Sequence, residues 1–244
     1  AVNNLQLNRL PQVPPQVPGA FSGQLRLAAN LNELTAESNQ NILARISANA
    51  TGNLAIAGGN VRIQNAQLQQ GNWQAQIVAA GVELGRLPQA PKQLQGAFNG
   101  ELKLAGNLDN FSANSERSPL SQINGSGSGE LRIAGGNIQF RELQLNEGNW
   151  QTEIVANNVQ LGRLPQVPPQ LQGAFNGELK LAGNLDALSA KSERSPLSQI
   201  NGSGSGKLQI AAGNIEFREL QLNQGNWQTE IVANNVQLGR LAQV

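Results

Sequence analysis

The sequence predicts an all-β protein: an elongated, curled antiparallel sheet built from three 77-residue repeats. Two observations carry this prediction. A tryptophan-bearing segment recurs at a fixed spacing, because Trp73, Trp150 and Trp227 lie 77 residues apart. In addition, short segments alternate strictly between apolar and polar residues, which is the period of a half-buried strand. Fixed self-similarity is typical of repeat architectures in which each copy buries its face against the next.

A recurring Gly-Ala-Phe triplet sets the repeat boundaries. Residues 1–18 correspond to the end of a preceding repeat, residues 19–95 form repeat 1, residues 96–172 form repeat 2, and residues 173–244 form an incomplete repeat 3. Repeats 2 and 3 differ at only 9 of 72 comparable positions. Because both ends of the chain correspond to points within a repeat, we expect the chain to be a piece of a longer array.

Repeat 2 is expected to contain about five strands, as judged from period-two alternation and turn signals. The segments ELKL and ELRI place their leucines and isoleucine on one face and their charged residues on the other. The predicted strands are Phe98–Asn107, Ile123–Ala134, Asn137–Asn146, Asn149–Ala156 and Val159–Leu164. The proline-rich residues 165–172 cannot donate to a ladder and are expected to cross to the next repeat.

Three turns fix the predicted register. Gly135-Gly136 is expected to pair Ile133 with Ile138, and Glu147-Gly148 to pair Leu145 with Trp150. Asn157-Asn158, which tolerate positive φ, are expected to form a hairpin turn that pairs Ala156 with Val159 on the inward face. A bulge near Arg141-Glu142 accounts for a break in the alternation.

A sheet of about 15 strands with one apolar face can be arranged in two ways. It closes on itself as a flattened sandwich, or it curls into an open trough with an apolar inner wall. The inward residues Gly125, Gly127 and Gly129 either permit tight curvature or leave room for a ligand. If the trough is open, an arginine replacing Leu131 is expected to reach its mouth and leave the protein folded.

The inward apolar positions form the candidate groove, in which each tryptophan is either a core residue or a contact residue. The residues predicted to line it are Leu25, Leu27, Leu54, Ile56, Val61, Ile63, Trp73, Ile77, Phe98, Leu102, Leu104, Gly127, Leu131, Ile133, Ile138, Phe140, Leu143, Leu145, Trp150, Ile154, Phe175, Leu179, Leu181, Leu208, Ile210, Ile215, Phe217, Trp227 and Ile231.

Composition excludes several classes of function. The chain has 17 Lys and Arg against 16 Asp and Glu and shows no basic patch, so nucleic acid is not an expected partner. Cys and His are absent, which removes disulfides, thiolate and imidazole metal ligands, and histidine-based catalysis. We therefore expect neither an enzyme nor a cofactor or metal. Arg86, Arg163 and Arg240 recur at the repeat ends, where exposed charges are favoured over contacts with lipid phosphates.

The repeat pattern resembles the TamB family (translocation and assembly module), in particular its cyanobacterial and chloroplast-envelope branch. The resemblance lies in the G-x-W-x-x-x-hydrophobic strand, the V-x-L-G-R-L ending and the L-Q-G-x-F-x-G-x-L-x-L-A-G-N-L opening. It implies a repeating β-groove, or β-taco, akin to AsmA-like proteins that carry phospholipids along an apolar trough. It also implies a periplasmic location between inner and outer membrane, with a membrane anchor and a domain that meets an Omp85-type barrel protein, both outside this chain.

These observations lead to two functional hypotheses. The first is a segment of a lipid-transfer bridge that shields phospholipid acyl chains and is linked to outer-membrane biogenesis. The second is a closed structural or adhesive spacer that binds no ligand. Unpaired edge strands at the two ends of the sheet further suggest end-to-end self-association.

Overall fold

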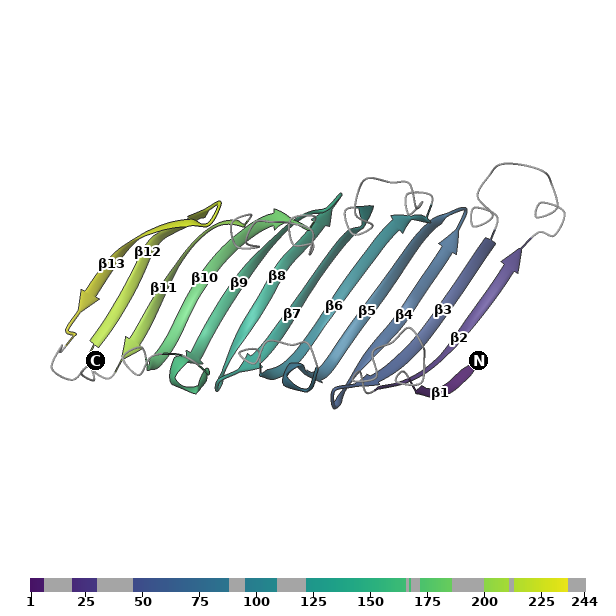
Figure 1. The fold of residues 1–244 in the computed structure, drawn as a ribbon, viewed down its shortest axis with the longest axis horizontal. Helices are drawn as coiled ribbons and strands as arrows, with labels where there is room; N and C mark the ends of the chain where they lie inside the picture. Colours follow the sequence, from purple (N-terminus) through teal and green to yellow (C-terminus); the bar gives the residue numbers. More distant parts are fainter. Residues whose placement is uncertain are drawn as a thin grey trace.

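The alternating segments form a single antiparallel sheet of 13 strands whose spatial order is the sequence order, β1 to β13 (Figure 1). The computed structural model describes residues 1–6, 19–29, 46–87, 95–108, 122–165, 167, 172–185, 200–210 and 213–236. Each strand is hydrogen-bonded to the strands before and after it in the chain, and β1 and β13 form the two ends of the row. The sheet is therefore open, and about 60 Å long at the usual spacing between strands.

Each repeat contributes four strands. A short strand β1 (Val2–Gln6) precedes repeat 1. Repeat 1 forms β2 (Gly19–Ala29), β3 (Ile46–Ile56), β4 (Gly59–Gln69) and β5 (Asn72–Glu83). Repeat 2 forms β6 (Gly96–Asn107), β7 (Asn124–Ile133), β8 (Gly136–Asn146) and β9 (Asn149–Gln160). Repeat 3 forms β10 (Gly173–Asn184), β11 (Asn201–Ile210), β12 (Gly213–Asn223) and β13 (Asn226–Asn234).

The prediction of a fifth strand was wrong in repeats 1 and 2, and in repeat 3 the segment concerned lies almost entirely outside the described residues. Strand β9 continues through Asn157-Asn158 to Gln160, and a 3-10 turn, η6 (Leu161–Arg163), takes the place of the expected strand end. The positive φ anticipated in this dipeptide is present, at Asn158, but it belongs to a bulge and not to a hairpin turn. The equivalent 3-10 turn in repeat 1 is η3 (Leu84–Arg86).

With four strands in each repeat, successive repeats join without a crossover to a distant strand. Strand β9 pairs directly with β10 in antiparallel register, so the seam between two repeats is an ordinary ladder. The predicted crossing path of the proline-rich residues 165–172 lies mostly outside the described residues.

Of the two remaining predicted turns, one was placed correctly. Glu147-Gly148 forms a two-residue turn that pairs Leu145 with Trp150, as expected. The other turn is shifted by one residue: Ala134 and Gly135 both have positive φ, and Leu131, not Ile133, pairs with Ile138. The shift preserves which face each side chain occupies.

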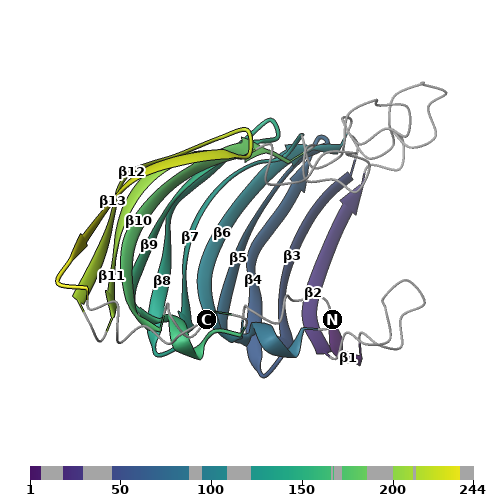
Figure 2. The ribbon, with the colours of Figure 1, turned by 60° about the vertical axis from the view of Figure 1, so that its left-hand side comes forward.

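The predicted bulge is confirmed near Arg141-Glu142. The ladders on both sides of β8 shift register there, and Glu142 has a φ of 49°. Equivalent shifts occur in β4 and in β12. Bulges bend a strand and raise its local twist, so one in each repeat favours curvature of the whole sheet. Figure 2 shows the result: the strands arch together, and the sheet has one concave face along its length.

Candidate functional site

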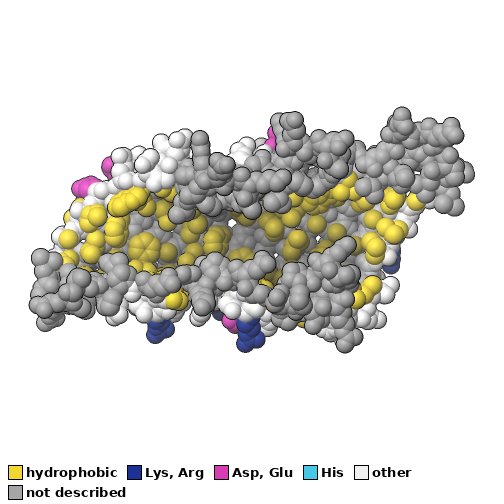
Figure 3. Space-filling view, viewed as in Figure 1, with side chains coloured by type: hydrophobic (Ala, Val, Ile, Leu, Met, Phe, Trp, Pro, Cys, Tyr) yellow, Lys and Arg dark blue, Asp and Glu magenta, His cyan; other side chains and the backbone are white. Residues whose placement is uncertain are grey.

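The concave face carries the apolar side chains. The strand registers place every predicted groove residue on one face, from Leu25 in β2 through Leu131 in β7 to Ile231 in β13. Figure 3 shows these hydrophobic side chains as a band along the hollowed face. We call this surface the trough. Its lining is continuous because equivalent residues of successive repeats follow one another along the row of strands.

One phenylalanine in each repeat lies across two glycines of the trough. A Cβ built on Gly129 would lie 2.8 Å from Cε2 of Phe98, and a Cβ built on Gly100 would lie 2.8 Å from Cζ of the same ring. Phe21 and Phe175 cover the equivalent glycine pairs in repeats 1 and 3. Glycine at these positions therefore serves the close packing of an aromatic ring.

The other inward glycines of β7 are covered in the same way. A Cβ on Gly125 would lie 2.8 Å from Cδ2 of Leu104, and one on Gly127 would lie 3.0 Å from Cδ1 of Leu102. The small residues permit the leucines of β6 to lie over the neighbouring strand. The space directly above Gly127 is thus filled by this chain's own side chain, so the trough floor here is made of leucine.

The tryptophans follow this pattern at the seams between repeats. The indole of Trp150 in β9 lies across Gly183 of β10, where a Cβ would approach Cζ2 to 2.9 Å. Trp73 lies across Gly106 in the preceding seam. Both indoles remain partly exposed on the trough face, whereas Trp227, in the last strand, is 69% exposed.

One end of the strands forms a closed core. The buried hydrophobic residues of the described part of the chain are Ala57, Val82, Leu131, Ile133, Val159, Leu208 and Ile210. Leu131 pairs with Phe98 on one side and Ile138 on the other, close to the Ala134-Gly135 turn, and is only 2% exposed. The expectation that an arginine at Leu131 could reach the trough mouth is therefore wrong, because this position is sealed.

Most of the remaining lining is only partly covered. Leu102, Leu143, Leu145 and Ile154 are intermediate in exposure, which leaves part of each side chain accessible. The trough thus combines a sealed end with an accessible floor. The packing expected of a closed core is therefore found at one end of the strands, and the accessible wall expected of a trough is found over the rest. The sheet as a whole does not close on itself.

Sequence reasoning missed several residues of the trough face. Val82 and Val159 are buried there beyond the bulges of β5 and β9, although neither is among the predicted groove residues. Val159 faces inward as expected, but it continues β9 and does not begin a fifth strand. Thr152 also faces the trough, and its hydroxyl donates to the carbonyl of Arg141 at 3.0 Å, within the bulge of β8. The further apolar residues missed are Phe21, Leu68, Leu220 and Leu222, whose alternation with polar neighbours could have identified them.

An asparagine of the next repeat caps each seam bulge. The backbone N–H of Asn158 donates to Oδ1 of Asn176 at 2.8 Å, and that of Gly81 donates to Oδ1 of Asn99 at 2.9 Å. At the first seam the N–H of Asn4 donates to Oγ of Ser22 at 3.0 Å. These bonds satisfy the amide that the extra residue leaves out of the ladder.

The outer face of the sheet is polar. Glutamine and asparagine pairs bridge neighbouring strands, as in the bonds from Gln151 to Gln144 at 2.7 Å and from Asn184 to Asn149 at 3.0 Å. Charged residues are interleaved with them, and Arg141 lies 3.7 Å from Glu153. Such exposed pairs stabilise the fold little but keep this face hydrated.

The shortest ion pair among the described residues is in repeat 3. Arg218 donates to Oε2 of Glu216 at 2.7 Å, and this hydrogen bond holds the pKa of the Glu216 carboxyl below its ordinary value of 4.5. The same contact raises the pKa of Arg218. Both groups lie on the outer face, away from the trough, where Arg218 is exposed and Glu216 is half-buried.

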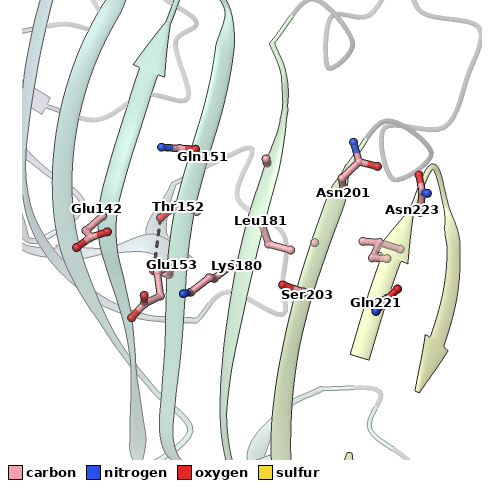
Figure 4. A pocket seen from close by; sticks show the side chains of 13 residues that line it. Glu142, Gln151, Thr152, Glu153, Lys180, Leu181, Asn201, Ser203, Gln221 and Asn223 are labelled. Atoms are coloured by element: carbon pink, nitrogen blue, oxygen red, sulfur yellow. Dashed lines mark hydrogen bonds between the residues drawn. The ribbon is translucent and has the colours of Figure 1, made fainter. Parts of the chain in front are cut away.

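A shallow hollow recurs along the sheet, at equivalent strands of successive repeats. One hollow, of about 670 Å³, spans β8 to β12 (Figure 4), and its lining combines polar residues such as Gln151, Lys180 and Ser203 with the trough residues Thr152, Leu181 and Leu222. A second, of about 520 Å³, has the equivalent lining one repeat earlier, including Gln74, Lys103 and Ser126.

The recurrent arginines lie at one edge of the sheet. Arg86 and Arg163 are exposed in the 3-10 turns η3 and η6, and their guanidinium groups lie near the hairpin turns at Gly58 and Gly135. Arg240 lies outside the described residues.

The described residues contain neither a candidate membrane-spanning helix nor a candidate metal site. None of the helical segments in these ranges is long and apolar enough to cross a membrane. Within the same ranges, no group of three or more His, Cys, Asp or Glu side chains is arranged to hold a metal ion.

Comparison with other proteins gives no assignment of family, because the chain matches no protein-family model, no curated protein and no solved structure.

Proposed function

We propose that this chain is a non-enzymatic conduit segment whose trough shields phospholipid acyl chains. The observation that carries the proposal is the placement of all the predicted groove residues on the concave face of one open sheet. A continuous apolar surface of this kind is unusual on a soluble protein and generally marks a binding site. The ligand that matches a long, unbranched apolar path is a hydrocarbon chain.

The distribution of polar groups supports the same function. Charged and amide side chains occupy the outer face, so one side of the sheet is suited to water while the other is suited to hydrocarbon. The hydroxyl of Thr152 is bonded to a backbone carbonyl, so it does not leave an unpaired polar group on the trough floor. An acyl chain would therefore meet carbon atoms along its path.

The wider role rests on the resemblance of the repeat motifs to the TamB family. In that role the trough is part of a lipid-transfer bridge in the periplasm, between inner and outer membrane, and serves outer-membrane biogenesis. Within this proposal, phospholipid is the ligand and an Omp85-type barrel protein is the expected protein partner. No cofactor or nucleic acid takes part in the proposed function.

A structural spacer is the second candidate, and one observation favours it. The phenylalanine and leucine side chains that cover the inward glycines fill part of the trough with the protein's own atoms. If this packing continues in solution without a guest, the repeats serve only as a rigid, elongated element. Occupancy by lipid distinguishes the two candidates.

The experiment uses two substitutions at adjacent residues on opposite faces. Leu143 faces the trough opposite Gly127 and is partly exposed, whereas Gln144 faces outward and is exposed. The full chain, Leu143→Arg and Gln144→Arg are each incubated with vesicles of dioleoyl-phosphatidylglycerol, separated from the vesicles, and analysed by native mass spectrometry. The number of bound lipids is compared between folded samples.

We expect the wild-type chain and Gln144→Arg to carry lipid, and Leu143→Arg to carry less. The arginine stem can lie along the trough, but its charge must remain hydrated and so interrupts the apolar path. Absence of lipid from the wild-type chain would favour the spacer. Equal loss in the two variants would show that lipid binding does not depend on which face carries the arginine, and would count against the trough as the site.

A further inference from the structure

The two long edges of the trough are built from different residues. One edge, here called the arginine rim, carries Arg86 and Arg163 in the 3-10 turns that follow β5 and β9. The opposite edge, here called the tryptophan rim, is formed by the turns Gln70-Gly71 and Glu147-Gly148, after which each of these strands begins. A tryptophan is the second residue of both strands, so the indoles lie at this rim.

The coverage of the apolar side chains changes from one rim to the other. In β7, Leu131 and Ile133 lie toward the arginine rim and are buried. In β9, Val159 lies toward the same rim and is buried, whereas Ile154 and Trp150 are only partly covered. The apolar surface that a ligand can reach therefore adjoins the tryptophan rim, and the sealed end of the strands separates it from the arginine rim.

The accessible floor has the width of one acyl chain. Trp150 and Ile154 are four residues apart in β9, which corresponds to about 13 Å along the strand. One acyl chain extends over about half of a hydrocarbon core that is about 30 Å thick, or about 15 Å. A chain that lies parallel to the strands, with its ester end at the tryptophan rim, therefore covers the accessible floor.

Electrostatic attraction of a phosphate to Arg163 would favour the opposite orientation. An exposed ion pair, however, contributes less than the burial of about two methylene groups. A phospholipid with its phosphate at the arginine rim would lay the first part of its tails over Leu131, Ile133 and Val159, which the protein already covers. Burial of apolar surface therefore decides the orientation in favour of the tryptophan rim.

The tryptophan rim has the chemistry of a boundary between hydrocarbon and water. Asn146 and Asn149 are exposed beside the turn, and the ring of Trp150 is partly exposed next to them. Tryptophan is enriched at the level of lipid headgroups because its ring is apolar and its N–H is polar.

This rim offers no cation to a headgroup. Among the described residues, from two residues before each of its turns to two residues after, there is no Lys or Arg. In sequence, residues 109–121 and 186–199, which connect strands that end and begin at this rim, contain no excess of Lys and Arg over Asp and Glu. A headgroup there meets amides and water, so its charge contributes little to binding.

We infer that each phospholipid lies with its headgroup at the tryptophan rim and its acyl chains across the strands, directed toward the sealed end. This orientation rests on the proposed function and adds to it which edge of the trough carries the headgroups. Lipids held in this way lie side by side along the row of strands. The trough selects for acyl chains and not for headgroup charge.

Two variants with a single tryptophan report on two depths of the trough. The first carries Trp73→Phe and Trp227→Phe and retains Trp150 at the rim. The second carries these changes together with Trp150→Phe and Phe140→Trp. Phe140 lies opposite Ile154, so its position is about 13 Å farther from the rim. If Phe140→Trp is not folded by circular dichroism, Ile154→Trp replaces it at the same depth.

Each variant is mixed with phosphatidylcholine that is brominated either near the ester end or near the methyl end of its acyl chains. We expect bromine near the ester end to quench the Trp150 variant more strongly, and bromine near the methyl end to quench the Phe140→Trp variant more strongly. The reverse order would place the headgroups at the arginine rim, and equal quenching in all four mixtures would show chains that run along the trough. Either result overturns the orientation and leaves the trough as a lipid site, whereas absence of quenching throughout would overturn the proposed function as well.

A matched pair of charge reversals tests the position of the headgroup independently. Glu147→Lys changes the tryptophan rim, and Glu83→Lys makes the same change at the arginine rim, where Glu83 lies beside the hairpin turn at Gly58. Each chain is incubated with vesicles of phosphatidylcholine and phosphatidylglycerol that have identical acyl chains, and the bound lipids are identified by native mass spectrometry.

We expect the wild-type chain to take up the two lipids in nearly equal amounts. Glu147→Lys should raise the ratio of phosphatidylglycerol to phosphatidylcholine about threefold, the effect of an exposed charge, while Glu83→Lys leaves it unchanged. An equal or larger effect of Glu83→Lys would overturn the assignment of the headgroup to the tryptophan rim. A wild-type preference for phosphatidylglycerol that Arg163→Gln removes would have the same consequence.

Discussion

The ring of Phe98 in β6 lies across Gly129 in β7, so closely that a Cβ on Gly129 would come within 2.8 Å of Cε2 of the ring. The same relationship joins Phe21 to Gly52 and Phe175 to Gly206. It is the repeated unit of packing in the trough. Phe98 also meets the edge of the Phe140 ring, with centroids 6.4 Å apart, so the aromatic layer extends over three strands.

Gly129→Val should destabilise the protein by about 1–3 kcal/mol, the usual effect of overpacking. The added side chain must displace the Phe98 ring and its contact with Phe140. Ser128→Val is the matched control, since this neighbour faces outward and is exposed, where a β-branched residue suits a strand. Urea denaturation measures both variants. Equal stability of the two would show that the close contact between ring and glycine does not constrain the fold.

Leu131→Arg should be strongly destabilising, by about 3 kcal/mol or more, because it buries a charge without a partner. Leu143→Arg lies on the accessible part of the same face and should cost much less, since its guanidinium can reach water. Thermal unfolding of the two variants, monitored by far-UV circular dichroism, gives the comparison. Similar melting temperatures would contradict the division of the trough into a sealed end and an accessible floor.

Asn176→Ala should cost about 1 kcal/mol, because it removes the acceptor for the Asn158 N–H at the seam bulge. Asn176→Ser should recover most of this loss, as Ser22 accepts the equivalent bond at the first seam. Hydrogen exchange at the Asn158 amide reports on the bond directly. If alanine and serine gave the same exchange rate, the cap would not be responsible for protection.

The Glu216–Arg218 contact predicts a small acid-dependent contribution to stability. Its hydrogen bond lowers the pKa of Glu216 in the folded state, so the contact stabilises the protein at pH values above the unfolded pKa. This contribution is lost as the pH falls through the lowered pKa. Glu216→Gln, which reproduces the Arg141–Gln139 pair of repeat 2, should remove this pH dependence and leave stability at neutral pH almost unchanged.

An NMR titration of the Glu216 carboxyl provides the direct check. Its midpoint should lie below that of a glutamate in an unstructured peptide, and Arg218→Gln should raise it. A midpoint that Arg218→Gln leaves in place would assign the shift to another cause.

The fold class and the trough face could be read from the sequence because both depend on alternation. Strand periodicity assigns each residue to a face irrespective of the exact turn position. The one-residue shift of the turn at Ala134-Gly135 therefore left the predicted faces of the flanking residues correct. The bulge near Arg141 was also visible, as a change of phase between Phe140 and Leu143.

Other features depend on contacts between strands and were not visible. A positive φ at Asn158 suits a turn or a bulge equally, and the choice is settled by Asn176, which accepts the bulge amide from the neighbouring strand. Likewise, Leu131 and Leu102 have the same pattern of neighbours in sequence. Only their distance from the strand ends decides that Leu131 is sealed and Leu102 is accessible.

The most direct test of the trough as an acyl-chain site is tryptophan quenching by brominated phospholipid. A chain with Trp73→Phe and Trp227→Phe retains only Trp150, whose indole faces the trough and is partly exposed. It is mixed with phosphatidylcholine brominated in the middle of its acyl chains, and emission is compared with that in the same lipid without bromine. Bromine quenches an indole only at close range, so the comparison reports contact with the acyl chain.

We predict quenching of Trp150 by the brominated lipid, and its loss when Leu143→Arg is added while Gln144→Arg leaves it intact. Emission from Trp150 that is the same in brominated and unbrominated lipid, in a chain that is folded by circular dichroism, would contradict the account.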